Sequence, residues 1–178
     1  IYQGQSGSPY SLVYSGDING DNGTSNDLIF IPTDAQVDQM QFLGTDAYTA
    51  EQQRANLKQW LATTRYVKDH RGEYFERYGD NLPFESHFDF HFGQKFGIRT
   101  GKYVHALELT LDIMNVANLL NKDWGRTFSS GYNSEFVSPI TYKGDGVFQF
   151  ANPSDMPLKY PSSYYSRWRG QVGLKYTF

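Results

Sequence analysis

Apolar and polar residues alternate along three stretches of the chain, at 86–96, 103–115 and 168–178. A period of two residues predicts β-strands, each with one apolar and one polar face. Strands of roughly ten residues, tilted by about 45°, have the length that a bilayer core requires. A fourth, weaker strand is predicted at Tyr10–Asp17.

The alternation divides each long stretch into two sets of side chains. In the second stretch, Glu108 and Thr110 separate the leucines, so polar and apolar residues lie on opposite faces. The predicted apolar faces consist of Phe88, Phe90, Phe92, Leu107, Leu109, Leu111, Ile113, Trp168, Val172, Leu174, Tyr176 and Phe178. We expect these residues to form one continuous apolar band, and we expect the strand at 168–178 to pair antiparallel with that at 103–115.

The connections between the predicted strands differ greatly in length. A short, glycine-containing turn is predicted at 97–102, whereas the segments 16–85 and 116–163 are long. Within the first long segment, Thr49 and Gln52 have the spacing of a capping box, which predicts one short helix near 50–64. Within the second, a hairpin is predicted to turn at Lys143–Gly146.

Short turns at one end of the strands and long loops at the other are typical of outer-membrane β-barrels. If the last strand runs toward the periplasm, the turn at 97–102 is periplasmic and both long loops are extracellular. The chain ends on Phe178 after apolar residues at alternate positions, as the last strands of bacterial outer-membrane proteins do. The alternative is a soluble β-sandwich whose last strand ends on phenylalanine.

Composition narrows the choice of function. The formal net charge is -3, and no cluster of basic residues indicates nucleic-acid binding. Cysteine is absent, so neither disulfides nor thiolate chemistry can be proposed, and the apolar runs are too short for a transmembrane helix. Aromatic residues make up 17% of the chain, which suits a β protein with a large surface and also suits a membrane barrel. Because the chain begins at Ile1 without methionine or a leader, we expect that further sequence precedes it.

Four segments together resemble a known family. They are YSGDINGDNGTSNDLIFIP, HRGEYFERYGDNLPFESHFDFHFGQKF, LELTLDIMNVANLLNKDWG and the last strand. They are similar to the C-terminal part of TonB-dependent outer-membrane receptors, in the Oar-like branch that carries a carboxypeptidase-regulatory-like domain and is related to SusC-like transporters. The resemblance covers about Tyr10 to Phe178.

The resemblance implies an all-β fold and an outer-membrane location. Residues 1–178 would supply about four antiparallel strands from the C-terminal end of a 22-stranded transmembrane barrel, without the plug domain. The implied partners are outer-membrane lipid, the TonB complex acting through the missing N-terminal part, a surface lipoprotein and a small substrate. The implied activity is active uptake of a nutrient such as an oligosaccharide, a peptide or a chelate.

The loop GDINGDNGTSND is the best candidate for a metal site. Asp17, Asn19 and Asp21 follow the spacing of the first ligands in calcium loops, and Asp27 is a fourth oxygen donor. The bidentate carboxylate expected at the twelfth position is missing, because that position is Leu28. A structural calcium ion and a plain Asx-rich turn therefore both remain open.

The strand at 86–96 carries a second polar group. His87, Asp89 and His91 are residue types that bind zinc or iron, but alternate residues of a strand lie about 6.6 Å apart, so the three do not converge without a bulge. A turn at 97–102 would place His91 opposite Glu108 and Asp89 opposite Thr110, which predicts a structural His–Glu pair.

Aromatic and amide residues gather near the ends of the predicted strands. The aromatics beside Arg167 and Arg169 are either a sugar-stacking platform or an interfacial aromatic belt; they are Tyr160, Tyr164, Tyr165 and Trp168. Asn115, Asn118 and Asn121 are interpreted as turn formers. No catalytic triad is indicated, so we expect no enzyme. The alternative function is a soluble β-rich module that binds glycans or peptides, and a metal-dependent hydrolase on His87, Asp89 and His91 is the third.

Overall fold

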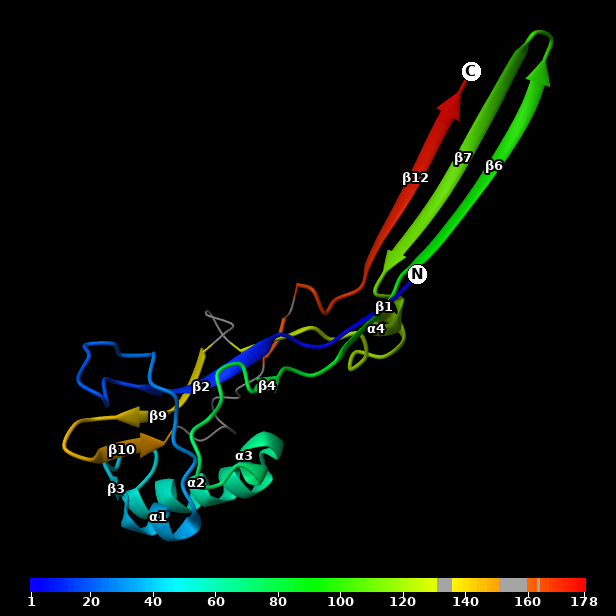
Figure 1. The fold of residues 1–178 in the computed structure, drawn as a ribbon. Helices are drawn as coiled ribbons and strands as arrows, with labels where there is room; N and C mark the ends of the chain where they lie inside the picture. Colours follow the sequence, from blue (N-terminus) through cyan, green and yellow to red (C-terminus); the bar gives the residue numbers. More distant parts are fainter. Residues whose placement is uncertain (131–135, 151–159, 163) are drawn as a thin grey trace. The chain divides into compact units, whose positions relative to one another are not determined.

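A computed structural model of the chain describes residues 1–130, 136–150, 160–162 and 164–178, and these form two compact units (Figure 1). Unit 1 comprises Ile1–Gly7, Pro83–Phe128 and Pro161–Phe178, and unit 2 comprises Ser8–Leu82 and Ser129–Tyr160. Strands predominate, in agreement with the predicted all-β class. Among the described residues, no helix combines the length and the apolar character needed to cross a membrane.

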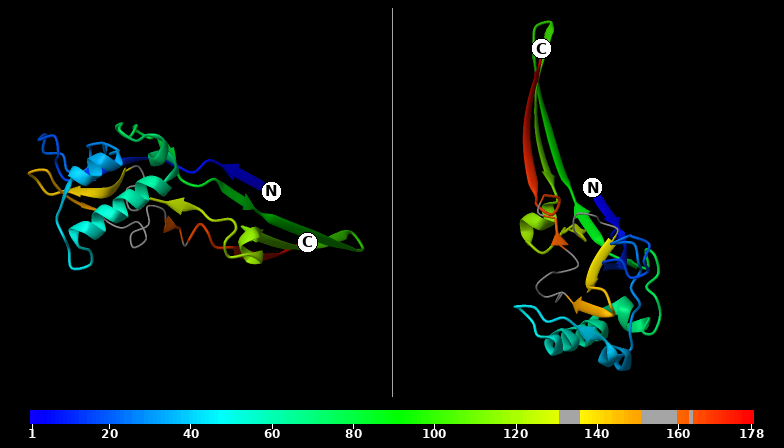
Figure 2. Two further views of the ribbon diagram at one scale, coloured as in Figure 1. Left: turned by 90° about the horizontal axis from the view of Figure 1, so that it is seen from below. Right: turned by 90° about the vertical axis from the view of Figure 1, so that its left-hand side faces the viewer.

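Unit 1 is built on a three-stranded antiparallel sheet. Its strands are β6 (Phe90–Thr100), β7 (Tyr103–Met114) and β12 (Arg169–Thr177), in the order β12-β7-β6. The three strands lie side by side in the right-hand view of Figure 2. Arg169 pairs with Met114 and Thr177 with Ala106, so the predicted antiparallel pairing of the last strand with the strand at 103–115 is confirmed.

The turn between β6 and β7 is tighter than the sequence suggested. Thr100 pairs directly with Tyr103, which leaves Gly101 and Lys102 as a two-residue loop. Gly101 has φ +64°, and a glycine with positive φ at the first central position is the arrangement of a type II′ hairpin. The predicted short, glycine-containing turn is therefore confirmed, but its predicted bounds, 97–102, are too wide, because residues 97–100 still belong to β6. As a result His91 lies opposite Asp112, and the predicted pairing of His91 with Glu108 and of Asp89 with Thr110 is wrong as well.

The strand predicted at 86–96 is in fact two strands that meet at Asp89. The first, β5 (Glu85–Phe88), pairs with β1 (Tyr2–Gln5), whereas β6 pairs with β7. Asp89 joins the two ladders: its N–H donates to the carbonyl of Ile1, and its Oδ1 accepts from the N–H of Asn115 at 2.8 Å. The break therefore arises because the chain changes its pairing partner, which residue alternation does not reveal.

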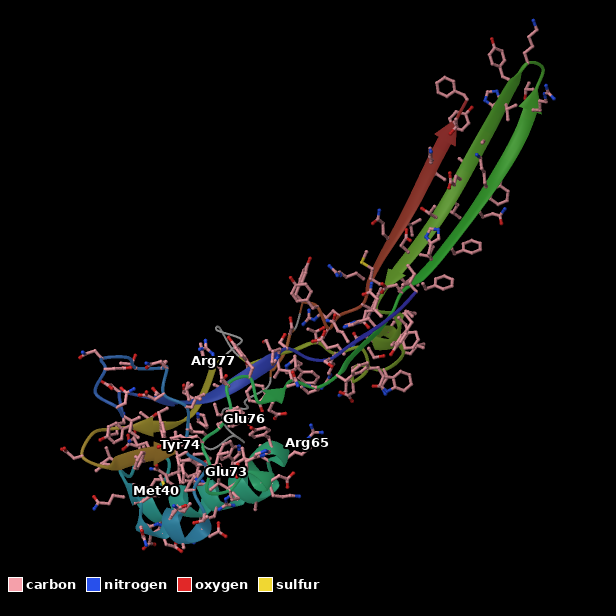
Figure 3. The ribbon with its side chains drawn as sticks, viewed as in Figure 1. Met40, Arg65, Glu73, Tyr74, Glu76 and Arg77 are labelled. Atoms are coloured by element: carbon pink, nitrogen blue, oxygen red, sulfur yellow. The ribbon has the colours of Figure 1, made fainter. Side chains whose placement is uncertain are left out.

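The register of the sheet separates an apolar face from a polar face. On the apolar face, Leu111 lies between Phe92 and Val172, and Leu107 lies between Phe96 and Tyr176. The opposite face carries three polar rows, which are His91–Asp112–Gln171, Gly93–Thr110–Gly173 and Lys95–Glu108–Lys175. Side chains project from both sides of the sheet in Figure 3, and the predicted alternation along β7 and β12 is confirmed.

Unit 2 contains a five-stranded sheet in the order β3-β10-β9-β2-β4. Its strands are β2 (Pro9–Ser15), β3 (Gln41–Phe42), β4 (Asp80–Asn81), β9 (Phe136–Tyr142) and β10 (Val147–Phe150). The predicted strand at Tyr10–Asp17 exists, as β2, but β2 pairs with β9 and β4 and not with the long strands of unit 1. The expectation of about four strands in one membrane sheet is therefore wrong, because three of them share that sheet in the described chain.

The helices of unit 2 lie in the segment that was expected to be a loop with one short helix. They are α1 (Asp34–Gln39), α2 (Ala50–Thr63) and α3 (Arg65–Asp69). The predicted helix near 50–64 is confirmed as α2, with the capping box of Thr49 and Gln52 formed and Leu57, Trp60 and Leu61 buried. The expectation of a single helix is wrong, because α1 and α3 are too short to show a helical period.

Burial of β2 explains why unit 2 has a core of its own. Tyr10, Leu12, Val13 and Tyr14 are all nearly inaccessible to solvent. Gln53 of α2 is buried as well: its Nε2 donates to the carbonyl of Leu43 at 2.7 Å and its Oε1 accepts from the N–H of Phe150 at 2.9 Å. This amide holds the helix against the sheet, since a buried polar group must keep its hydrogen bonds.

The hairpin predicted in the second long segment is confirmed. Strands β9 and β10 pair antiparallel, with Phe148 opposite Tyr142, so the chain turns at Lys143–Gly146 as expected. Beyond the two sheets, α4 (Val116–Leu120) follows β7 directly, and β8 (Phe128–Ser129) pairs with β11 (Tyr160–Pro161).

Candidate functional site

A polar cavity of about 430 Å³ lies in unit 1, where β7 ends and β12 begins. This volume is in the range of about 300–1,000 Å³ that is usual for small-molecule sites. Acidic and basic side chains both line the cavity; the charged ones are Glu85, Asp89, Arg167 and Arg169, together with His87. We call this space the unit 1 cavity.

Glu85 is the most enclosed charged group of the unit 1 cavity. Its side chain is 8% exposed. Its Oε2 accepts hydrogen bonds from Gln5 Nε2 at 3.1 Å and from Thr127 Oγ1 at 3.3 Å. Pairing of β1 with β5 sets Gln5 directly opposite Glu85, so the ladder itself positions the donor. A buried carboxylate needs such donors, because an unpaired charge away from water is costly.

Thr127, His87 and Glu85 lie close enough to raise the question of a catalytic triad. His87 Nε2 is 3.2 Å from Thr127 Oγ1 and 3.8 Å from Glu85 Oε2. In a triad the hydroxyl and the carboxylate contact different nitrogens of the imidazole, so that one holds the ring while the other gives up a proton. Here the hydroxyl of Thr127 and the carboxylate of Glu85 both lie next to the same nitrogen, Nε2 of His87. The three side chains therefore do not have the geometry of such a triad.

The structure separates the three residues that were considered for a metal-dependent hydrolase. His87 lies beside Thr127, Asp89 accepts from Asn115, and His91 Nδ1 lies 2.5 Å from Asp112 Oδ1. Each side chain thus has a different partner. In the part of the chain that the structure describes, no group of three His, Cys, Asp or Glu side chains is placed to hold a metal ion.

Asn115 fixes the end of β7 beside the unit 1 cavity. It adopts a left-handed conformation, with φ 53°, and is 4% exposed. Its Nδ2 donates to the carbonyls of Gly125 and Ser166, at 2.8 and 3.1 Å. Asn118 and Asn121 make similar local contacts, to the backbone of residues 122–124. The interpretation of the three asparagines as turn formers is confirmed, but the pattern of the sequence did not reveal that Asn115 lines a cavity.

The aromatic residues beside Arg167 and Arg169 contact one another. The guanidinium of Arg169 lies 4.9 Å from the centre of the Tyr164 ring, and Tyr164 meets Tyr165 edge to face at 5.1 Å. Trp168 is 46% exposed, and the side chain of Tyr160 lies outside the described residues. A sugar-stacking platform and an aromatic belt both stay predictions.

The predicted calcium loop of unit 2 is held by hydrogen bonds. Both carboxylate oxygens of Asp17 accept backbone N–H groups, from Gly20, Asp21 and Asn22. Asn19 Nδ2 donates to Asp21 Oδ2 at 3.1 Å and to Asp27 Oδ1 at 2.6 Å. The side chains of Asn19, Asp21 and Asp27 therefore do come together, but a donor group stands between the two carboxylates. Calcium binding stays a prediction.

Hydrogen bonding also affects the acidity of this loop. The N–H of Gly23 donates to Asp21 Oδ1 at 2.6 Å and, with the Asn19 amide, lowers the pKa of the Asp21 carboxyl below its usual value. Both contacts favour the charged form. Asp21 is fully exposed, so these hydrogen bonds stabilise the conformation of the loop and do not contribute to the core of unit 2.

A second cavity, of about 610 Å³, adjoins the loop within unit 2. Asn19 and Asp27 form its polar side, and Phe30 and Tyr74 form its aromatic side. The two rings meet edge to face at 5.2 Å, and Tyr74, labelled in Figure 3, is 68% exposed. Sequence reasoning missed both aromatics, because they are far apart in the chain and meet through an isolated β-bridge.

Comparisons of the chain with protein-family models, with curated proteins and with solved structures find no match.

Proposed function

We propose that the chain forms part of the wall and of the extracellular loops of a TonB-dependent outer-membrane receptor. The observation that carries the proposal is the three-stranded sheet of unit 1, which has one apolar and one polar face with side chains exposed on both. Phe96, Val172 and Leu174 are 55%, 71% and 70% exposed. A barrel wall requires such a sheet, since lipid contacts one face and the aqueous lumen the other.

Energetics favour a membrane over water as the surroundings of this sheet. Burying one large aliphatic side chain stabilises a protein by about 1.5–3 kcal/mol. In water, a sheet with a whole row of exposed apolar side chains would therefore associate with other apolar surfaces. In the described chain both outer edges, of β6 and of β12, lack a strand partner. Open edges in lipid are costly, so neighbouring barrel strands would pair with them.

The remaining roles follow from this arrangement. Leu107, Leu109 and Leu111 would face outer-membrane lipid, and the segments 16–85 and 116–163 would be extracellular. A nutrient, such as an oligosaccharide, a peptide or a chelate, would bind to the loops and the lumen. Transport would need the TonB complex, and a surface lipoprotein would help to capture the substrate. The bacterial outer membrane is thus the proposed location.

Labelling of two adjacent residues tests the proposal. The chain has no cysteine, so Leu109→Cys and Glu108→Cys each provide one site for a spin label. In vesicles that contain the full-length receptor, whose neighbouring strands cover the edges of the sheet, a label at position 109 should collide mainly with oxygen, which concentrates in lipid. The matched label at position 108 should collide mainly with a water-soluble nickel complex. Equal accessibility at the two positions would exclude the barrel wall.

The alternative, a soluble β-rich binding module, is favoured by one observation. Unit 2 has its own buried core and a cavity with an aromatic side, both of which suit a glycan- or peptide-binding domain. The same labels decide between the functions: a soluble module would remain folded without detergent and would show no depth-dependent difference between positions 108 and 109.

A further inference from the structure

We propose that the unit 1 cavity binds a short peptide with free termini, its ammonium group at the acidic side and its carboxylate at the basic side. The inference deepens the proposed function and rests on it in one respect, since it names the substrate class of that receptor. It is carried by the charges, spacing and hydrogen bonds of the side chains that line the cavity.

The N-terminal ammonium of Ile1 donates to the backbone carbonyl of Asp89 at 2.7 Å, and the carboxylates of the acidic side have room for a further cationic partner. Glu85 Oε2 is occupied by Gln5 and Thr127, but within the described chain Glu85 Oε1 accepts no hydrogen bond. Asp89 uses only Oδ1, for the N–H of Asn115. Two carboxylate oxygens therefore stay available beside the cavity, and an ammonium group can donate to either of them.

The arginines of the basic side also lack an acidic partner among the described residues. Among the described residues, neither Arg167 nor Arg169 forms an ion pair, although Glu85 and Asp89 line the same cavity. Arg169 Nη1 donates only to the hydroxyl of Tyr164, at 3.1 Å. A guanidinium binds a carboxylate through two parallel hydrogen bonds, so either arginine can take the C-terminus of a peptide.

The sheet fixes how far apart the two sides are. Arg169 pairs with Met114 on one side of β7, and on the other side Asp89 directly precedes Phe90, which pairs with Ile113. One strand, β7, therefore separates Asp89 from Arg169. Neighbouring strands lie about 4.8 Å apart, so the two backbones are about 10 Å apart.

This spacing selects the length of the ligand. Two extended residues span at most about 7 Å. Because side chains reach into the gap from both backbones, a dipeptide or tripeptide can contact both sides at once. A single positive or negative ion would satisfy only one side and leave the opposite charges unpaired.

A blocked-peptide series tests the proposal on the unaltered 178-residue chain. Dialanine, N-acetyl-dialanine and dialanine amide are titrated calorimetrically into the chain in detergent micelles. We expect dialanine to bind, and we expect each blocked peptide to bind at least tenfold more weakly, because each has lost one charge. The proposal fails if all three bind equally, or if dialanine does not bind at millimolar concentration.

Two variants assign the charges to their partners. Glu85→Gln should weaken dialanine binding and abolish the penalty of N-acetylation, while the penalty of amidation stays. Arg167→Gln should do the reverse. Glu108→Gln and Arg99→Gln remove the same charges elsewhere in unit 1 and should leave both penalties unchanged. If Glu85→Gln does not fold, judged by circular dichroism, the peptide series and Arg167→Gln still decide the matter.

The titration and the label experiment fail independently. If the labels indicate a barrel wall but the peptides do not bind, the receptor function stands and its substrate is of another class. If the peptides bind as expected but the labels at 108 and 109 do not differ, the chain is a soluble peptide-binding module and the receptor function is wrong.

Discussion

Leu109 and Thr110 are consecutive residues at the middle of β7 that face opposite sides of the same sheet. Leu109 lies between Gln94 and Leu174, whereas Thr110 lies between Gly93 and Gly173. Gly173 leaves room for Thr110, because a Cβ at residue 173 would come within 2.5 Å of Thr110 Oγ1. The two positions therefore share the backbone but not the surroundings.

This pair gives a direct test of which face meets lipid. Leu109→Arg should lower the free energy of unfolding by about 2–4 kcal/mol, the cost of an arginine at the bilayer midplane. Thr110→Arg, the same substitution one residue later, should cost much less, because its side chain faces the aqueous side. Urea unfolding from vesicles measures both.

Glu108→Arg is a poorer control than Thr110→Arg. Glu108 lies between Lys95 and Lys175, so an arginine there would bring three positive charges into line and add a repulsion unrelated to lipid. The face assignment is wrong if Leu109→Arg and Thr110→Arg destabilise the protein equally.

Backbone conformation alone should make Gly101 harder to replace than Gly97. Gly101 has a positive φ, and a Cβ at either glycine would meet no atom within 4 Å. Gly101→Ala should therefore cost at least about 1–2 kcal/mol, because a positive φ brings the Cβ of an L-residue too close to the backbone. Gly97→Ala, within β6, should be neutral or slightly stabilising. The midpoints of urea unfolding provide the comparison, and equal midpoints would contradict the hairpin geometry.

Features with a local cause could be predicted from the sequence. Alternation of apolar and polar residues predicts β7 and β12, and the capping box of Thr49 predicts α2. The glycines near residue 145 predict the β9–β10 hairpin. In each case, neighbours within a few residues determine the conformation. The same reasoning assigned the leucines of β7 to one face of the strand, and Glu108 and Thr110 to the other.

Features that depend on distant segments could not be predicted. The sequence of β2 suits a barrel strand as well as a core strand, and only its pairing with β9, more than a hundred residues later, decides the matter. Likewise, Asp89 interrupts a predicted strand because Ile1 and Asn115 bind it. The unit 1 cavity escaped notice because Gln5, Glu85 and Thr127 come from separate parts of the chain.

Calcium binding to the loop at residues 16–28 would require the Asn19 amide to turn its oxygen toward Asp21 and Asp27. If it does so, millimolar calcium should slow proteolysis of the loop. Asp21→Ala should then remove the protection, since it deletes one of the carboxylates that Asn19 joins. Asp46→Ala, in a separate exposed loop, serves as the control. Cleavage rates that do not respond to calcium would leave the loop as an Asx turn.

Tyr10 should make the stability of unit 2 fall at alkaline pH. Burial raises the pKa of the Tyr10 hydroxyl above its usual value of 10.0, and the hydrogen bond to Asp80 Oδ2, 2.7 Å long, raises it further. Above pH 10 the unfolded chain loses this proton while the folded chain keeps it. The stabilisation is therefore complete below pH 10 and is lost as the pH rises toward the folded pKa.

Tyr10→Phe keeps the ring in the core and removes the titrating group. At neutral pH it should cost about 1 kcal/mol, the usual contribution of one hydrogen bond. At alkaline pH the difference from the unaltered chain should shrink, because the variant no longer loses stability through this residue. Tyr14, whose pKa burial also raises, should maintain part of the slope, and the double variant with Tyr14→Phe should lose more of it. Urea unfolding followed by circular dichroism across pH 10 measures these slopes, and an unchanged slope in Tyr10→Phe would refute the assignment.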